Sequence, residues 1–274
     1  MTALVDKYLR FSDKTDSILC VGLDPALPRQ RSLNAIPGRY LEETADENEA
    51  ILEFCLDIID QTRDFCCAYK PNQQYIWGLT KKQHKRLTTA IHKADAISLL
   101  DYKLNDIGAT TESALFHIHE CGYDAITFNP LLGNLQKIVA LAHKYSPQIG
   151  IIVLTLTSNP EAVRYQKEAT IRGKPMYVAI AEDVKKCEAD GCVIGATGHV
   201  TEEDIRTVRA KAGEDKLFLI PGIGAQKGDA EKVIKTAGKK LLINVGRAVI
   251  YSENPAQKAE QYDRSFNELR KAEP

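Results

Sequence analysis

The sequence lacks several features that would place the chain in a special class of proteins. It has no apolar run long enough to span a bilayer, and the charges of residues 1–14, including Asp6 and Lys7, leave no uncharged core of a secretion signal. Its seven cysteines contain no C-x-x-C motif, which favours reduced packing residues. Neither charge sign dominates, because 36 Lys and Arg face 37 Asp and Glu, so binding to nucleic acid by bulk charge is not expected. These absences predict a globular protein of the cytoplasm without nucleic-acid or membrane partners.

Familiar catalytic and metal-binding motifs are missing as well. There is no G-x-S-x-G nucleophile elbow and no H-E-x-x-H spacing. His117 and His119 are two residues apart on a predicted helix, so they do not share a face. We therefore expect no metal site.

The sequence does contain a regular alternation of short apolar runs and longer amphipathic runs. Strand–helix units recur about every 30 residues, as parallel strands joined by crossovers require. The predicted strands cover 18–24, 65–70, 96–103, 125–129, 150–156, 191–196, 217–221 and 240–246. The predicted helices cover 43–63, 81–94, 106–121, 135–145, 176–187, 202–212, 229–237 and 255–271. Eight such units predict an α/β fold of the (β/α)8 TIM-barrel type, with residues 1–274 as a single domain; an open doubly wound sheet is the alternative.

Two predicted connections, 25–41 and 157–175, are unusually long. Loops of that length in a compact fold are usually lids or binding loops. Both follow predicted strands, so in a barrel both lie at the catalytic face.

Charged side chains end the first three predicted strands, on faces that are otherwise apolar. Alternate residues of a strand share a face. These faces are Ile18, Cys20, Gly22 and Asp24 in the first strand, Cys66, Ala68 and Lys70 in the second, and Ile97, Leu99, Asp101 and Lys103 in the third.

In a barrel, the charged residues Asp24, Lys70, Asp101 and Lys103 would converge on the mouth. Alternating acids and bases in a partly dry site keep one another ionised. Such an array positions a lysine ammonium without a metal. The alternatives are a solvated surface pair for Asp101 and Lys103, and an N-terminal helix cap for Asp106.

Glycine-rich segments follow the last two predicted strands. Gly222 and Gly224 come after the seventh strand, and Gly246 and Arg247 after the eighth. In many barrels these two loops bind phosphate, because glycine lets the backbone approach the oxygens and arginine offers a fork of donors. The pattern predicts a phosphate site, with ordinary turns as the alternative.

Taken together, these motifs resemble the orotidine 5′-phosphate decarboxylase family over residues 18–251. The resemblance is carried by Asp101-x-Lys103-x-x-Asp106-Ile107, Lys70-Pro71-Asn72, Pro221-Gly222-Ile223-Gly224-Ala225-Gln226 and Gly246-Arg247, in the family's order. Lys70-Pro71-Asn72 and the chain length resemble the longer, type 2-like subgroup. The resemblance implies a cofactor-free carboxy-lyase that converts orotidine 5′-monophosphate to UMP and carbon dioxide, the last step of de novo UMP biosynthesis.

The resemblance also implies roles for individual residues. Lys103 would protonate C6 of the pyrimidine, beside Asp101 at the departing carboxylate and Lys70 in the same charged array. Asp106 and Thr110 would reach into the neighbouring subunit's site, which implies a homodimer with shared active sites. The substrate-binding residues implied are Asp24 for a ribose hydroxyl, Ser158 for the pyrimidine amide edge, Gln226 between base and phosphate lid, and Gly246 and Arg247 for the phosphate.

Two rival functions stay open at this point. One is a metal-dependent sugar-phosphate decarboxylase or aldolase, which would be expected to carry an acid where Lys70 stands. Activity that survives EDTA separates it from the cofactor-free lyase. The other is a catalytically silent nucleotide-binding or scaffold barrel, which the intact Asp101, Lys103 and Asp106 set opposes and an assay of carbon dioxide release decides.

Overall fold

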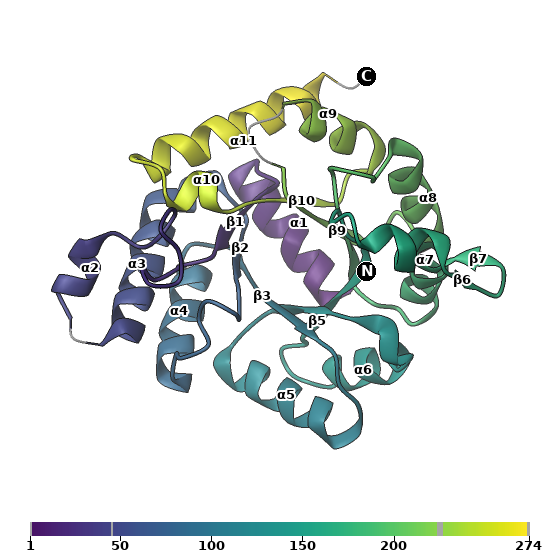
Figure 1. Ribbon diagram of the computed structural model, residues 1–274, viewed down its shortest axis with the longest axis horizontal. Helices are drawn as coiled ribbons and strands as arrows, with labels where there is room; N and C mark the ends of the chain where they lie inside the picture. Colours follow the sequence, from purple (N-terminus) through teal and green to yellow (C-terminus); the bar gives the residue numbers. More distant parts are fainter. Residues whose placement is uncertain (1, 45, 224–226, 273–274) are drawn as a thin grey trace.

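The computed structural model describes residues 2–44, 46–223 and 227–272, and its central feature is a closed barrel of parallel strands (Figure 1). Around the barrel the strand order is β1-β10-β9-β8-β5-β4-β3-β2, and each neighbouring pair is parallel. The strands are β1 (Leu19–Leu23), β2 (Ala68–Pro71), β3 (Ile97–Leu104), β4 (Ala125–Phe128), β5 (Gly150–Leu156), β8 (Gly191–Ile194), β9 (Leu217–Pro221) and β10 (Leu241–Val245). The predicted TIM barrel is confirmed, and the open doubly wound sheet is wrong.

Helices form an outer ring around the strands (Figure 1). They are α3 (Glu47–Thr62), α4 (Lys81–Lys93), α5 (Gly108–Cys121), α6 (Leu135–Ala142), α7 (Met176–Lys186), α8 (Glu202–Ala212), α9 (Lys227–Thr236), the short α10 (Arg247–Ile250) and α11 (Pro255–Lys271). The helix predicted from residue 43 begins at Glu47, because the Asp46 side chain accepts a hydrogen bond from the backbone N–H of Asn48 and caps it. Among the described residues, no helix has the length and apolar character that crossing a membrane requires.

The two long connections contain structure of their own. The first holds helix α2 (Gly38–Glu42). The second holds a π-helical segment, η3 (Val163–Glu168), and a small antiparallel hairpin formed by β6 (Thr170–Ile171) and β7 (Lys174–Pro175). Both lie at the end of the barrel where the carboxyl ends of the strands meet.

An N-terminal helix that the strand–helix pattern did not predict, α1 (Ala3–Thr15), lies across the middle of the ring of strands (Figure 1). Its buried side chains Leu4, Val5, Tyr8 and Phe11 pack with the apolar residues that line the barrel interior. A Cβ atom at Gly150, the first residue of β5, would come within 2.4 Å of Leu4, so only glycine permits this close contact. The helix therefore closes the end of the barrel opposite the strands' carboxyl ends.

Inward-facing residues alternate along the strands largely as predicted. Cys20, Ala68, Ile97 and Leu99 belong to the interior cluster. Ile18 and Cys66, which were expected on the same faces, pack instead in the cluster between barrel and helices. The alternation starts only where β1 and β2 pair, at Cys20 opposite Ala68, and both exceptions precede that point.

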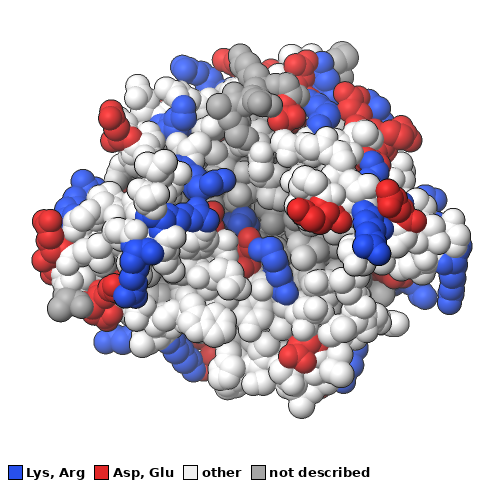
Figure 2. Space-filling view, in the orientation of Figure 1, with Lys and Arg blue, Asp and Glu red and all other residues white. Residues whose placement is uncertain are grey.

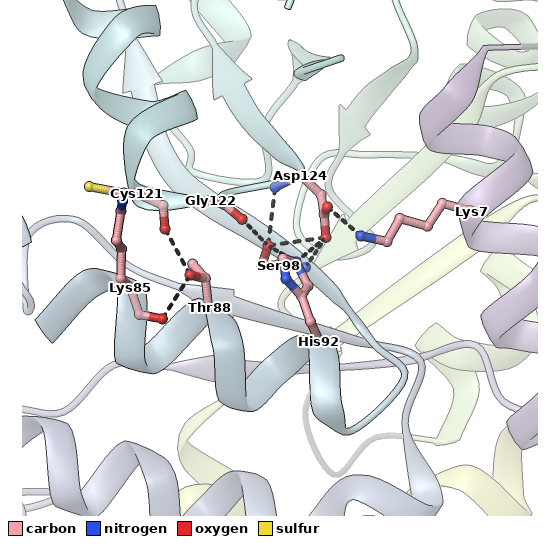
Figure 3. Close-up of polar contacts among 8 residues, drawn as sticks. All are labelled: Lys7, Lys85, Thr88, His92, Ser98, Cys121, Gly122 and Asp124. Atoms are coloured by element: carbon pink, nitrogen blue, oxygen red, sulfur yellow. Dashed lines mark hydrogen bonds and ion pairs between the residues drawn. The ribbon is translucent and has the colours of Figure 1, made fainter. Parts of the chain in front are cut away.

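A polar cluster below the barrel ties α1 to the strands (Figure 3). Asp124, one residue before β4, forms an ion pair with Lys7 of α1 and accepts hydrogen bonds from His92 Nε2 (3.0 Å) and from the Ser98 backbone N–H (2.9 Å). Ser98 Oγ and Asp124 Oδ2 both contact the same histidine nitrogen, so this is not the relay of a hydrolytic triad, in which the two groups use opposite ring nitrogens. The cluster is structural and lies at the end of the barrel away from the charged mouth.

Replacing Asp124 by asparagine should destabilise the fold without changing kcat. Burial alone would raise the pKa of Asp124, but His92 and Lys7 outweigh burial and lower it, so the carboxylate stabilises the folded state. We expect a loss of about 2 kcal/mol at neutral pH, the scale for breaking a buried hydrogen-bonded ion pair. The loss should shrink as the pH falls below about 4, where this carboxylate becomes protonated on unfolding.

Urea unfolding of the Asp124→Asn variant at several pH values measures this effect. Asp13→Asn, an exposed position on the same helix α1, is the matched control and should unfold like the wild type. Equal stability of the Asp124 variant and the control at pH 7 would show that the cluster does not anchor α1.

Candidate active site

Three charged side chains from two neighbouring strands form a continuous array at the mouth of the barrel. Asp101 lies at the centre and accepts hydrogen bonds from Lys70 Nζ (2.8 Å, at Oδ2) and Lys103 Nζ (2.7 Å, at Oδ1). The side chains of Lys70 and Asp101 are only 6% and 12% exposed, whereas that of Lys103 is 50% exposed. Figure 2 shows this face of the molecule hollowed at its centre, with charges of both signs in the hollow. The array therefore presents one accessible ammonium, that of Lys103, next to the buried ion pair of Lys70 and Asp101.

The ionisation of this array is held by mutual attraction. Burial alone would raise the pKa of Asp101, but the ammonium groups of Lys70 and Lys103 outweigh burial and hold that pKa well below its usual range. Burial would likewise lower the pKa of Lys70, yet the carboxylates of Asp101 and Asp24 raise it above the ordinary value. At neutral pH the buried lysine and Asp101 are therefore both charged.

Asp24 stands next to this array, directly after β1. Its Oδ1 accepts a hydrogen bond from Asn72 Nδ2 (2.9 Å), and Asn72 comes directly after β2, the strand that carries Lys70. A Cβ atom at Gly246 would lie 3.1 Å from Asp24 Oδ2, so glycine allows the β10 backbone to approach this carboxylate closely. The sequence motif included Asn72 but attached no role to it, and the structure shows that it orients Asp24.

A cavity of about 500 Å3 opens beside Asp24, Lys70 and Asp101. Its other side is formed by residues of the loops after β9 and β10, including Gly222, Gly246 and Arg247. Gly222 has φ +86°, a conformation that favours glycine. The volume lies in the range of small-molecule sites. Two members of the charged array, Lys70 and Asp101, therefore share one cavity with the predicted phosphate loops. Gly224 and Gln226 lie outside the described residues.

Four predicted site residues do not line this cavity. Lys103 is joined to it through Asp101, which lines the cavity and accepts a hydrogen bond from Lys103 Nζ. Ser158 follows β5 and packs against the backbone at Gly195, where an added Cβ would come within 2.7 Å of it. Asp106 uses its carboxylate to accept the Ile107 backbone N–H (2.8 Å), and Thr110 is exposed in the first turn of α5. The N-cap residue of α5 is Ile107, and Asp106 lies one residue before it. The prediction that Asp106 caps this helix is therefore wrong.

Two further polar residues at the mouth were missed. Thr127 of β4 donates a hydrogen bond to Asp101 Oδ1 (3.0 Å), and Asn244 of β10 lines the cavity with a buried Oδ1 that has no partner among the described residues. Ala125 and Leu242 face the barrel interior, so the residues two positions later also face inward. A polar residue at an inward position near the strand's end was the signal that could have found both.

The donor set at the mouth suits an anion better than a metal ion. Both oxygens of Asp101 accept hydrogen bonds from ammonium groups, so a cation would have to displace a lysine. Across the described part of the chain, no three His, Cys, Asp or Glu side chains gather as a metal site would require. The exposed Arg247 instead brings positive charge to the cavity, and the Lys103 ammonium adds a second positive charge beside Asp101.

Comparison with known proteins points to one family. Residues 17–262 match the family model described as orotidine 5′-phosphate decarboxylase / HUMPS family. An orotidine 5′-phosphate decarboxylase from Roseiflexus castenholzii is 33% identical over 275 residues, covering 94% of this chain and 93% of the relative. One from an Azoarcus species is 36% identical over 251 residues, covering 86% of each. The solved structure of Leishmania donovani OMP decarboxylase superposes with a TM-score of 0.78 at 25% identity, over 97% of this chain and 99% of that one.

Proposed function

The chain belongs to the orotidine 5′-phosphate decarboxylase family and converts orotidine 5′-monophosphate to UMP, and we propose that Lys103 protonates C6 of the pyrimidine in this reaction. The observation that carries the proposal is the Lys70–Asp101–Lys103 array, in which a half-exposed ammonium is held by a buried, ionised carboxylate. The type 2-like subgroup and the cytoplasmic location remain predictions.

The chemistry explains why such an ammonium is useful. The bond between C6 and the carboxylate carbon breaks, carbon dioxide leaves, and the electron pair stays on C6 as a carbanion that the ring delocalises poorly. A positive charge fixed beside C6 stabilises this carbanion more than the substrate, which is the requirement for raising kcat. The Lys103 ammonium then transfers its proton to C6, and the resulting neutral amine regains a proton from solvent. No oxidant, reductant or other co-reactant is consumed.

The remaining cavity residues would hold the nucleotide away from the reacting carbon. Asp24 and Lys70 would contact the ribose, and Gly246 and Arg247 would bind the phosphate dianion. Arg247 is exposed at the cavity, and its planar fork of donors suits phosphate oxygens. Ser158 would read the pyrimidine amide edge, and Gln226, which lies outside the described residues, would link the base to the phosphate lid.

Replacing Arg247 by alanine should chiefly weaken nucleotide affinity. Loss of a bidentate charge-assisted contact costs about 2–3 kcal/mol, which corresponds to a rise in KM or in the UMP dissociation constant of about 30- to 150-fold. Steady-state kinetics with orotidine 5′-monophosphate and calorimetry with UMP measure the two quantities. Arg206→Ala, an exposed arginine on α8, is the control. An unchanged UMP affinity in the Arg247 variant would place the phosphate elsewhere.

We also propose a homodimer in which Asp106 and Thr110 complete the partner's site. Neither residue lines the cavity of its own subunit. Large apolar side chains are exposed on the segments that follow three consecutive strands, at the rim that carries both residues. They are Trp77 after β2, Ile107 after β3, and Leu131 and Leu132 after β4. The part of this face that lies over β3 and α5 is mainly uncharged (Figure 2), which suits contact with a second copy.

The activity itself is tested by the conversion of orotidine 5′-monophosphate in the presence of EDTA. We expect release of carbon dioxide and formation of UMP at the same rate with and without the chelator. Loss of activity with EDTA would support the metal-dependent alternative instead. Binding of UMP without any turnover would support a silent nucleotide-binding barrel.

A further inference from the structure

The backbone at Lys103 is held in an unusual conformation. Its φ is +54°, in the left-handed region that costs a residue with a side chain about 1–2 kcal/mol. The pairing of β3 with β4 shifts at the same place, because Leu100 pairs with Ile126 and Leu104 with Phe128. Three residues of β3, from Asp101 to Lys103, therefore stand opposite one residue of β4. Such a bulge re-aims side chains and persists only where neighbouring groups hold it.

The single residue opposite the bulge is Thr127, which is 1% exposed. Its Oγ1 accepts a hydrogen bond from the Lys103 backbone N–H (2.9 Å) and lies 3.0 Å from Asp101 Oδ1. The backbone N–H can only donate and the ionised carboxylate can only accept, so the hydroxyl proton points to Asp101. Both contacts of this hydroxyl are thereby assigned.

Asp101 Oδ1 is also the oxygen that accepts from Lys103 Nζ at 2.7 Å. The Thr127 hydroxyl thus closes a ring with Lys103 by fixing its backbone on one side and the carboxylate that holds its ammonium on the other. Lys70 occupies the second oxygen, Oδ2, so the carboxylate cannot rotate without breaking a buried ion pair. Each end of the flexible Lys103 side chain has a defined anchor.

We infer that Thr127 is a positioning residue of the decarboxylation, whose hydroxyl keeps the Lys103 ammonium aimed into the site; this inference rests on the proposed role of Lys103. Thr127 is buried and does not line the cavity, so we do not expect it to touch substrate. Its effect should therefore fall on the chemical step, where alignment matters, and leave nucleotide binding to the loops after β9 and β10.

The test compares Thr127→Ser with Thr127→Ala, because both lose the methyl group and only the serine keeps the hydroxyl. The alanine variant should lose kcat by about 10- to 100-fold, the effect of a catalytic group displaced by about 1 Å. The serine variant should keep most of the wild-type kcat. The affinity of both variants for UMP should stay close to the wild-type value. Thr155→Ala on β5 is the control for losing a buried threonine, because the Thr155 hydroxyl donates to the Val153 carbonyl (3.0 Å), and this variant should retain kcat.

Equal kcat values for the serine and alanine variants would overturn the inference, as would a kcat loss in Thr155→Ala as large as that in Thr127→Ala. Thermal unfolding of all variants identifies any loss that comes from misfolding, and the serine–alanine ratio is measured below the lower melting temperature. Failure of the proposed function has a different signature. In that case Lys103→Ala itself keeps turnover, whereas an inactive Lys103→Ala together with an unaffected Thr127→Ala contradicts only the positioning role.

Discussion

Lys103→Ala is expected to abolish measurable turnover of orotidine 5′-monophosphate while leaving UMP binding largely intact. The variant removes both the positive charge that stabilises the C6 carbanion and the proton that quenches it. Removing one such preorganised donor elsewhere costs about 100- to 1,000-fold in kcat, and a group that also supplies the proton should cost more. Because the Lys103 side chain is half exposed and Asp101 keeps its ion pair with Lys70, the fold should survive.

Single-turnover measurement of carbon dioxide release and calorimetry with UMP separate chemistry from binding in this variant. Lys185→Ala, an exposed lysine on α7, is the matched control and should behave like the wild type. Near-normal turnover in Lys103→Ala would remove Lys103 from the mechanism. Loss of UMP binding together with turnover would indicate a role in holding the nucleotide instead.

Mixing two inactive variants, Lys103→Ala and Asp106→Asn, should restore activity if the sites are shared between subunits. In a hybrid dimer, the subunit that keeps Lys103 receives an intact Asp106 from its partner, so one of the two sites is complete. Random exchange of subunits makes half of the dimers hybrid, so about one quarter of the wild-type activity should return. This recovery requires that Asp106 acts across the interface rather than within its own chain.

Subunit exchange must be verified independently, for example by mass spectrometry of differently tagged chains. Mixing Lys103→Ala with Lys103→Ala carrying the second tag is the control, and it should stay inactive because no hybrid has an intact lysine. Verified exchange without recovered activity would contradict the shared site, and a monomer in solution would contradict the dimer.

The barrel could be predicted from sequence because its determinants are local and repeated. Each strand is a short apolar run, each helix an amphipathic one, and the interior positions Cys20, Ala68, Ile97 and Leu99 follow from period-two alternation. The Asp101–Lys103 and Lys70 placements follow from the same rule, since the carboxyl ends of parallel strands meet at one rim. Helix α1 was not predicted, because its apolar side chains pack inside the barrel against strands that lie far along the chain.

Side-chain contacts between strands could not be predicted, because they depend on the register of the strands and not on the pattern within one strand. The Thr127 hydroxyl matters only because β3 bulges opposite it, and the register shift between Leu100 and Leu104 cannot be read from either strand alone. The pairing of Asn72 with Asp24 likewise joins two loops 48 residues apart. Alternation predicts which way a side chain points, but register decides which polar group it meets.

The central claim is that the Lys103 ammonium faces C6 of the bound pyrimidine, and a crystal structure of the protein with UMP tests it most directly. The account predicts Lys103 Nζ within about 3.5 Å of C6, the separation of groups poised to react, with Asp101 still bonded to Nζ and the phosphate at Gly246 and Arg247. The account would be contradicted by a nucleotide bound with C6 far from Lys103. It would also be contradicted by a Lys103 side chain that points away from the base into bulk water.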